Sequence, residues 1–183
     1  MSLFLAPIHQ LMYDKIHSTD GLAKAIATED DAIRRTLKEK FPSIEDAPLE
    51  EVIDTSNIHG WLAERVALAE ERLAFAATAM AKKDEEKLLS IVKQSAKKLH
   101  FQGTAEEAFQ TYDSFFLNGM PCDRVHMPVD SDEGFAWQVT QNVHAPYYDD
   151  PALYDRLMEA WWEGFLANTD LRYEIEGDRR HIY

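Results

Sequence analysis

The chain has 183 residues, of which 45% are hydrophobic, and its 33 acidic and 19 basic residues give a net charge of -14. A chain of this size buries roughly 70% of the surface that its unfolded form exposes, so we expect one domain over residues 1–183. The negative charge opposes binding to nucleic acid, which is itself a polyanion.

Two further observations bear on the compartment. The apolar start has no basic residues before it, and no apolar run approaches the roughly 20 residues that span a bilayer, so we expect neither a signal peptide nor a membrane helix. The only cysteine, Cys122, excludes an internal disulfide. We therefore expect a cytoplasmic protein.

The first 118 residues are predicted to be mainly helical. Pro7 suits the first turn of a helix that reaches toward Gly21, and a second helix covers 28–40, ending before Pro42. Pro48 begins a short helical turn.

The clearest helix is predicted over 57–83. Its apolar seam recurs at spacings of three and four residues through Leu62, Val66, Ala69, Leu73, Ala76 and Met80. A face this wide must be covered by other helices, by the sheet or by a second subunit, so a homodimer through this helix is one hypothesis. A charged helix over 84–100 and another from Thr104 to the Asn118-Gly119 stop come next.

A β-hairpin is predicted between Pro121 and His144, because apolar and polar residues alternate there. One face would carry Val125, Met127, Val129, Phe135, Trp137, Val139 and Val143. The other would gather Cys122, Arg124, His126, Gln138, Thr140, Asn142 and His144. This polar face is the candidate site, although an antiparallel sheet often turns such a face simply to water or to another subunit.

The hairpin loop is predicted to be the five residues 130–134, which places Val129 opposite Phe135 and His126 opposite Gln138. Cys122 and His126 would then be roughly 13 Å apart along one strand, too far for a catalytic pair. His144 would lie diagonally across the ladder from Cys122. A Cys122–His144 pair is the better candidate for catalysis, with Arg124 available for an anionic group.

A helix capped by Asp149 or Asp150 and a second hairpin turning at Gly177-Asp178 complete the chain. The order of helices, hairpin, helix and hairpin predicts an α+β fold with an antiparallel sheet of about four strands. Metal ligation by Cys122, His144 and His181, or by His9, Tyr13 and His17, lacks the local ligand pairs of structural zinc, so no metal site is predicted. The sequence identifies no cofactor.

The C-terminal segments 137–146, 163–168, 171–174 and 177–183 resemble the C-terminal pattern of the L-2-amino-thiazoline-4-carboxylic acid hydrolase-like family and of related 4-vinyl-reductase-type small-molecule-sensing domains. In that pattern a strand ends in Cys-Pro, a helix ends in Gly-Phe-Asn-Pro, and a cysteine follows a Gly-Asp turn. Here His144-Ala145-Pro146 stands in place of Cys-Pro, and His181 replaces the later cysteine. The resemblance therefore implies the fold more than the activity.

Three hypotheses for function follow. The first is a ligand-binding or sensory domain that holds a small anionic or aromatic molecule. Its predicted ligand-binding residues are Arg124, His126, Gln138, Thr140, Asn142, Glu174 and His181. The second is a hydrolase of a small amide-like or cyclic C–N bond, with Cys122 as nucleophile and His144 as base. The third is a helix-mediated homodimer without small-molecule function.

Overall fold

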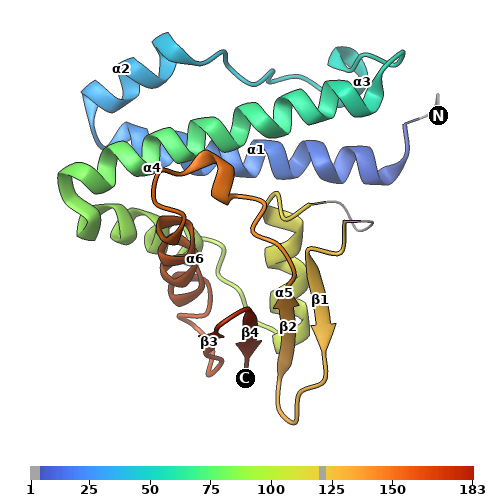
Figure 1. Cartoon of the computed structure of the whole chain (residues 1–183), viewed down its shortest axis with the longest axis vertical. Coiled ribbons are helices and arrows are strands. Elements are labelled where there is room, and N and C mark those ends of the chain that lie inside the picture. The colour runs from blue at the N-terminus through green and yellow to red at the C-terminus, as the bar shows by residue number, and fades with distance from the viewer. Residues whose placement is uncertain (1–4, 120–122) are drawn as a thin grey trace. The chain divides into compact units, whose positions relative to one another are not determined.

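The computed structural model of the chain describes residues 5–119 and 123–183, and it confirms the α+β fold. Helices occupy the N-terminal half, and a four-stranded antiparallel sheet lies in the C-terminal half of the described chain (Figure 1). The residues form two compact units, one up to Met80 with Ser114–Leu117, the other Ala81–Asp113 with Asn118–Tyr183. The single domain over residues 1–183 stays a prediction.

The first unit contains α1 (Pro7–Thr28), α2 (Asp31–Lys40), α3 (Leu49–Val52) and the first part of α4 (Ile58–Lys97). Pro7 begins α1, and the side chain of Asp30 caps α2 by accepting hydrogen bonds from two backbone N–H groups. Helix α1 continues past Gly21, which lies exposed within it.

A buried ion pair joins α1 to α4. The Nε atom of Arg72 lies 2.6 Å from Oδ1 of Asp20, and both side chains are almost fully buried. Nη1 of Arg72 also donates a hydrogen bond to the carbonyl of Pro42 at 3.0 Å. These partners meet the requirement that a buried charge be both paired and hydrogen-bonded.

Helix α4 breaks at Asp84, where φ is -163° and ψ is 93°. The Asp84 carboxylate accepts a hydrogen bond from the backbone N–H of Lys87 and so caps the following helical segment. The prediction of one helix ending near 83 and another beginning at 84 is thus confirmed. Most of the apolar seam ahead of the break is buried, with Ala69, Leu73 and Ala76 fully buried, whereas Val66 is half-buried.

The second unit holds the sheet, α5 (Ala105–Phe115) up to Asp113, the short 3-10 helix η2 (Ala145–Tyr147) and α6 (Ala152–Phe165). The strands β1 (His126–Val129), β2 (Phe135–Val139), β3 (Tyr173–Glu176) and β4 (Arg179–Ile182) lie in the order β1-β2-β4-β3. Each neighbouring pair is antiparallel.

The register of the first hairpin differs from the predicted one by one residue. Val129 pairs with Ala136 and His126 with Val139, so six residues separate the paired ends. Gly134 adopts a left-handed backbone (φ 69°) beside the carbonyl of Ile182, an approach that leaves no room for a Cβ atom.

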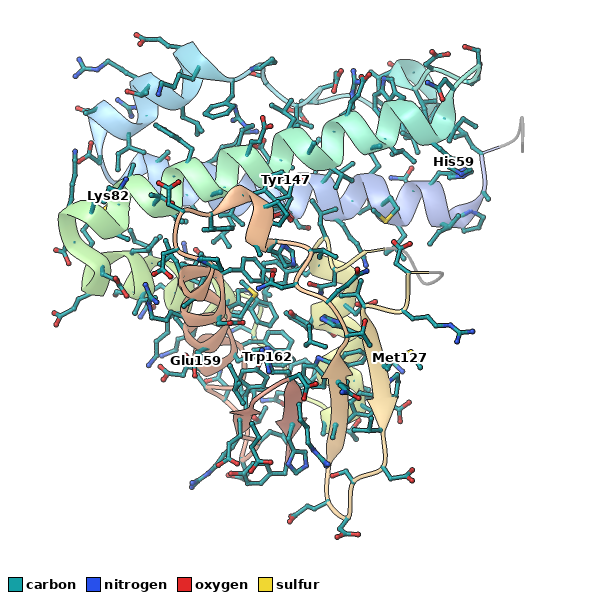
Figure 2. The ribbon with its side chains drawn as sticks, in the orientation of Figure 1. His59, Lys82, Met127, Tyr147, Glu159 and Trp162 are labelled. Atoms are coloured by element: carbon teal, nitrogen blue, oxygen red, sulfur yellow. The ribbon has the colours of Figure 1, made fainter. Side chains whose placement is uncertain are left out.

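This shift turns over every side chain of β1 relative to the prediction. His126 shares a face with Trp137, whereas Met127 is exposed (Figure 2). The prediction for β1 was therefore wrong. For β2 it was right, because Trp137 is buried and Gln138 is exposed.

We call the face with Trp137 the inner face, because α5 and α6 pack on it. Phe109 of α5 stacks on Phe135 of β2, with ring centroids 4.7 Å apart. Trp162 of α6 stacks on Tyr173 of β3 at 5.0 Å, and it lies between the helix and the sheet (Figure 2). The inner face is consequently an aromatic layer.

Helix α6 also makes a close backbone contact with the second part of α4. A Cβ atom added to Gly164 would lie 2.0 Å from the carbonyl oxygen of Lys93, well inside van der Waals contact. Only glycine allows the two helices to approach this closely.

We predict that Gly164→Ala lowers the free energy of unfolding by roughly 1–3 kcal/mol, because overpacking forces the backbones apart. The matched control is Gly21→Ala. It lies in α1 with no atom within 4 Å of the added Cβ, so alanine should leave stability unchanged or raise it. Urea denaturation of the three proteins checks both effects, and equal stability of Gly164→Ala and wild type would contradict the close contact.

Candidate functional site

A cavity of about 440 Å³ lies at the inner face of the sheet, within the second unit. This volume falls in the range of about 300–1,000 Å³ typical of small-molecule sites. Its walls come from α5, the first hairpin and the loop after it, α6 and the terminal hairpin. The lining includes Tyr112, Asn118, His126, Trp137, Thr140, Asn142, His144, Tyr154, Asp155, Met158, Tyr173 and Arg180.

A turn after β2 places His144 in this wall. Oδ1 of Asn142 accepts hydrogen bonds from the backbone N–H groups of His144 and Ala145, which starts η2. The imidazole stacks on Tyr154, with ring centroids 3.7 Å apart, and its Nε2 lies 3.3 Å from Oδ1 of Asn118. His144 is thus buried and held in one orientation by a helix, a loop and a turn.

Two phenols line the same cavity, that of the buried Tyr112 and that of the half-buried Tyr173. Burial raises the pKa of Tyr112 far above its ordinary value of 10.0, and the nearby carboxylate of Asp113 raises it further. Burial likewise raises the pKa of Tyr173 well above 10.0. Both groups therefore stay protonated under physiological conditions and can donate hydrogen bonds.

Arg180 contributes a positively charged side chain to the cavity. It lies opposite Trp137 in the register of β2 and β4, so its side chain is on the inner face. Its Nη2 atom lies 3.4 Å from Oδ1 of Asp155, in the first turn of α6. The indole N–H of Trp137 is buried and has no hydrogen-bond partner among the described residues. Unsatisfied buried donors are uncommon in proteins, so this N–H is an unusual feature of the packing around the cavity.

His126 lies in this cavity and not on the outer face where it was predicted. Its side chain is 9% exposed, and its ring lies among Phe109, Tyr112 and Trp137. Nδ1 lies 3.6 Å from Oδ1 of Asp113. The one-residue shift of register is the physical reason for the change of face.

Thr140 and Asn142 follow β2 and reach the cavity at its exposed margin, together with Gln141. The Thr140 hydroxyl donates a hydrogen bond to the carbonyl of Arg124, whose own backbone is left-handed (φ 51°). Arg124 is exposed and is not among the residues that line the cavity.

Three of the predicted ligand-binding residues lie on the outer face of the sheet. Gln138 donates a hydrogen bond to Asp178, and Glu174 accepts one from the hydroxyl of Tyr183. Nε2 of His181 lies 2.9 Å from the hydroxyl of Ser131 and 2.6 Å from the carbonyl of Glu133. The structure therefore does not bring these three together with His144.

Cys122 lies outside the described residues, so the predicted pairing of Cys122 with His144 stays a prediction. Sequence reasoning missed several polar groups that line the cavity together with His144, namely Tyr112, Asn118, Tyr154, Asp155 and Arg180. The signal that could have found Arg180 is alternation in the terminal strand, where it shares a parity with the buried Ile182.

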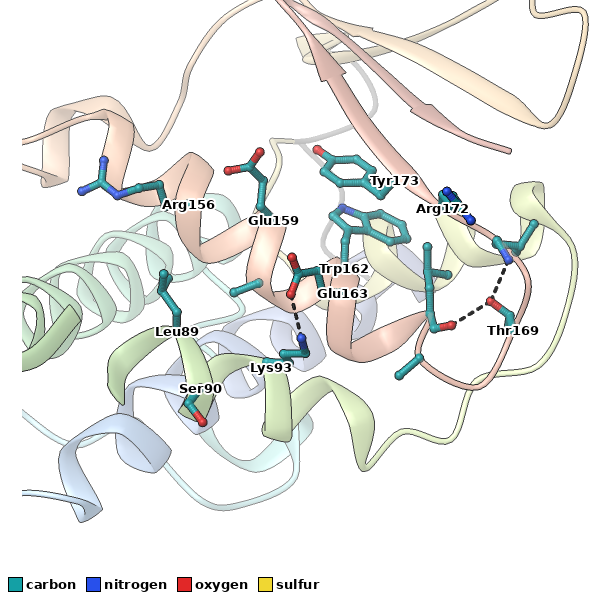
Figure 3. A pocket seen from close by; sticks show the side chains of 14 residues that line it. Leu89, Ser90, Lys93, Arg156, Glu159, Trp162, Glu163, Thr169, Arg172 and Tyr173 are labelled. Carbon is teal, nitrogen blue, oxygen red and sulfur yellow. Dashed lines mark hydrogen bonds and ion pairs between the residues drawn. The ribbon is translucent and has the colours of Figure 1, made fainter. Parts of the chain in front are cut away.

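A second and more open hollow of about 800 Å³ lies between α4, α6 and the segment before β3 (Figure 3). Its charged side chains are largely paired with one another or with neighbours outside it. Nζ of Lys93 lies 2.8 Å from Glu163, and Arg156 pairs with Glu85 and Asp150. Tyr173 lines both hollows, and Trp162, whose indole N–H is also buried and without a hydrogen-bond partner among the described residues, lines the larger one. The buried side chains of His144 and Asn118 line the smaller one.

The chain matches no protein-family model, no curated protein and no solved structure. The resemblance of the C-terminal segments to the hydrolase-like family accordingly stays a prediction. In residues 5–119 and 123–183 no helix is long and apolar enough to cross a membrane. The same residues contain no group of three or more histidine, cysteine or acidic side chains arranged to hold a metal ion.

The buried phenols give a prediction for alkaline pH. Tyrosine in the unfolded chain ionises near pH 10, but Tyr112 and Tyr173 stay protonated in the fold, so the unfolded state gains stability as the pH rises above about 10. We expect Tyr112→Phe or Tyr173→Phe to weaken this alkaline loss of stability. Phenolate absorbance, followed from neutral pH to about pH 11 in the folded state, should be the same in each variant as in wild type. A smaller absorbance gain in either variant would show that its phenol ionises normally.

Proposed function

We propose that this chain is a small-molecule-binding or sensory domain whose ligand occupies the cavity at the inner face of the sheet. The observation that carries the proposal is the convergence of buried polar groups on an aromatic-lined cavity. His144 and Asn118 are about 95% buried, and the indole N–H of Trp137 lacks a described partner. The walls of this cavity combine aromatic rings with many polar side chains, and polar groups at defined positions beside aromatic rings are features of ligand pockets.

The unpaired indole N–H of Trp137 is unusual for a packed core. A buried donor without an acceptor costs about 1–3 kcal/mol, and a well-packed core would avoid that cost. The proposed site thus keeps His126, Thr140, Asn142 and His144 from the sequence-based hypothesis, but moves the ligand from the outer face to the inner one.

No specific observation favours the two other hypotheses. The hydrolase hypothesis depends on Cys122, which lies outside the described residues. The homodimer hypothesis was motivated by a broad apolar seam, of which all the residues except the half-buried Val66 are buried. Both remain predictions.

The proposal is tested by blocking the mouth of the cavity. Gln141 lines the cavity at its exposed margin, and its side chain makes no hydrogen bond within the described chain, so Gln141→Trp can cover the mouth without disturbing the core. A library of small aromatic acids, amides and amines is screened by ligand-observed NMR. We expect the hits found with wild type to lose binding at least about tenfold in this variant.

The control is Gln102→Trp, another exposed glutamine of the same unit that lies away from the cavity. It should bind the same hits as wild type. Hits that bind all three proteins equally would place the ligand elsewhere and would overturn the proposed site.

A further inference from the structure

We infer that the ligand of this cavity is a planar aromatic carboxylate, that Arg180 binds the carboxylate, and that Asp155 is the internal counter-ion which the ligand displaces. This inference rests on the proposed function. It adds the chemical class of the ligand and the residue pair that selects it.

Arg180 is positioned and largely desolvated by the sheet. It lies in β4 between Trp137 of β2 and Ile175 of β3, and its side chain is 11% exposed. A guanidinium in such surroundings interacts with an anion more strongly than one in open solvent does. Arginine also matches the planar geometry of a carboxylate by forming two parallel hydrogen bonds.

Part of the guanidinium is not used by the protein. Nη1 donates to the carbonyls of Gly177 at 2.6 Å and of Arg179 at 3.2 Å, which fixes the position of the group. Nη2 has only Asp155, at 3.4 Å, and within the described chain nothing accepts a hydrogen bond from Nε. The edge of the guanidinium formed by Nε and Nη2 is therefore nearly unoccupied. This edge can bind a carboxylate through two parallel hydrogen bonds.

Asp155 is a poor partner for this edge. Ion-paired hydrogen bonds are usually about 2.7–2.9 Å long, so a distance of 3.4 Å is a weak contact. The Asp155 side chain is 45% exposed and can turn to water without desolvation. A ligand carboxylate that replaces it would gain two short bonds, against the repulsion of the displaced Asp155 carboxylate, which water screens.

The remaining walls indicate what the carboxylate is attached to. The rings of Trp137 and Tyr173 stack at 6.0 Å with an interplanar angle of 29°, and His144 stacks on Tyr154. Such surfaces favour a flat aromatic body. The phenols of Tyr112 and Tyr173 stay protonated, and Arg180 and Asp155 lie close enough to influence their pKa values. They would donate hydrogen bonds to an anion without repelling it.

The test compares cinnamate with cinnamamide, which have the same shape and differ in charge, by isothermal titration calorimetry on the full chain. We expect wild type to bind cinnamate at least about tenfold more tightly than the amide. Asp155→Asn removes the competing charge, so it should tighten cinnamate binding severalfold and leave the amide unchanged. Arg180→Met should abolish the preference for cinnamate.

Arg179→Met is the matched control, because the neighbouring Arg179 pairs with Gln138 and faces outward. It should keep the preference for cinnamate. If Arg180→Met does not fold, Asp155→Asn still tests the inference. Asp155 is partly exposed, and Arg180 is the only hydrogen-bond or ion-pair partner of its side chain in the described chain. Equal binding of the two probes to wild type, with no effect of Asp155→Asn, overturns the inferred ligand class and leaves the proposed function standing. If neither probe binds, the inferred ligand class is overturned. The proposed site is then supported only by hits from the NMR screen whose binding Gln141→Trp weakens.

Discussion

The aromatic layer between the helices and the sheet is the constraint on which the second unit depends. Trp162 and Tyr173 stack at 5.0 Å, Tyr173 and Trp137 at 6.0 Å, and Tyr112 contacts Trp162 at 4.9 Å. Each such pair contributes about 0.5–1.5 kcal/mol beyond the burial of its area. The layer holds α6 and α5 on the inner face. The cavity is lined partly by rings of this layer and partly by polar side chains.

The close approach of Gly164 to Lys93 fixes the other side of α6. With one side of the helix held against α4 and the other against the aromatic layer, its first turn presents Tyr154 and Asp155 to the cavity. The polar wall is thus built by packing far from it. This is the usual way in which a rigid scaffold positions binding groups.

Much of the fold could be predicted from the sequence, because it depends on local patterns. The apolar seam of α4, the cap at Asp84 and the alternation in β2 each follow from a few neighbouring residues. The faces of β1 could not be predicted, because they depend on whether the loop before Ala136 holds five residues or six. In that loop, the left-handed Gly134 lies against the carbonyl of Ile182, a residue 48 positions away in the chain. A pattern of neighbouring residues does not reveal such a contact. His144 lies beyond the end of β2, so alternation does not determine its burial.

The central claim, that a ligand binds at the inner face beside Trp137, is tested most directly by the indole N–H resonances of the four tryptophans. A ¹H–¹⁵N spectrum is recorded as a hit from the ligand-observed screen is added, with the resonances assigned by single Trp→Phe variants. The account predicts that the Trp137 signal moves saturably, while that of Trp61, in the first unit, stays in place. A Trp137 signal that does not move, or a shift confined to Trp61, would contradict it.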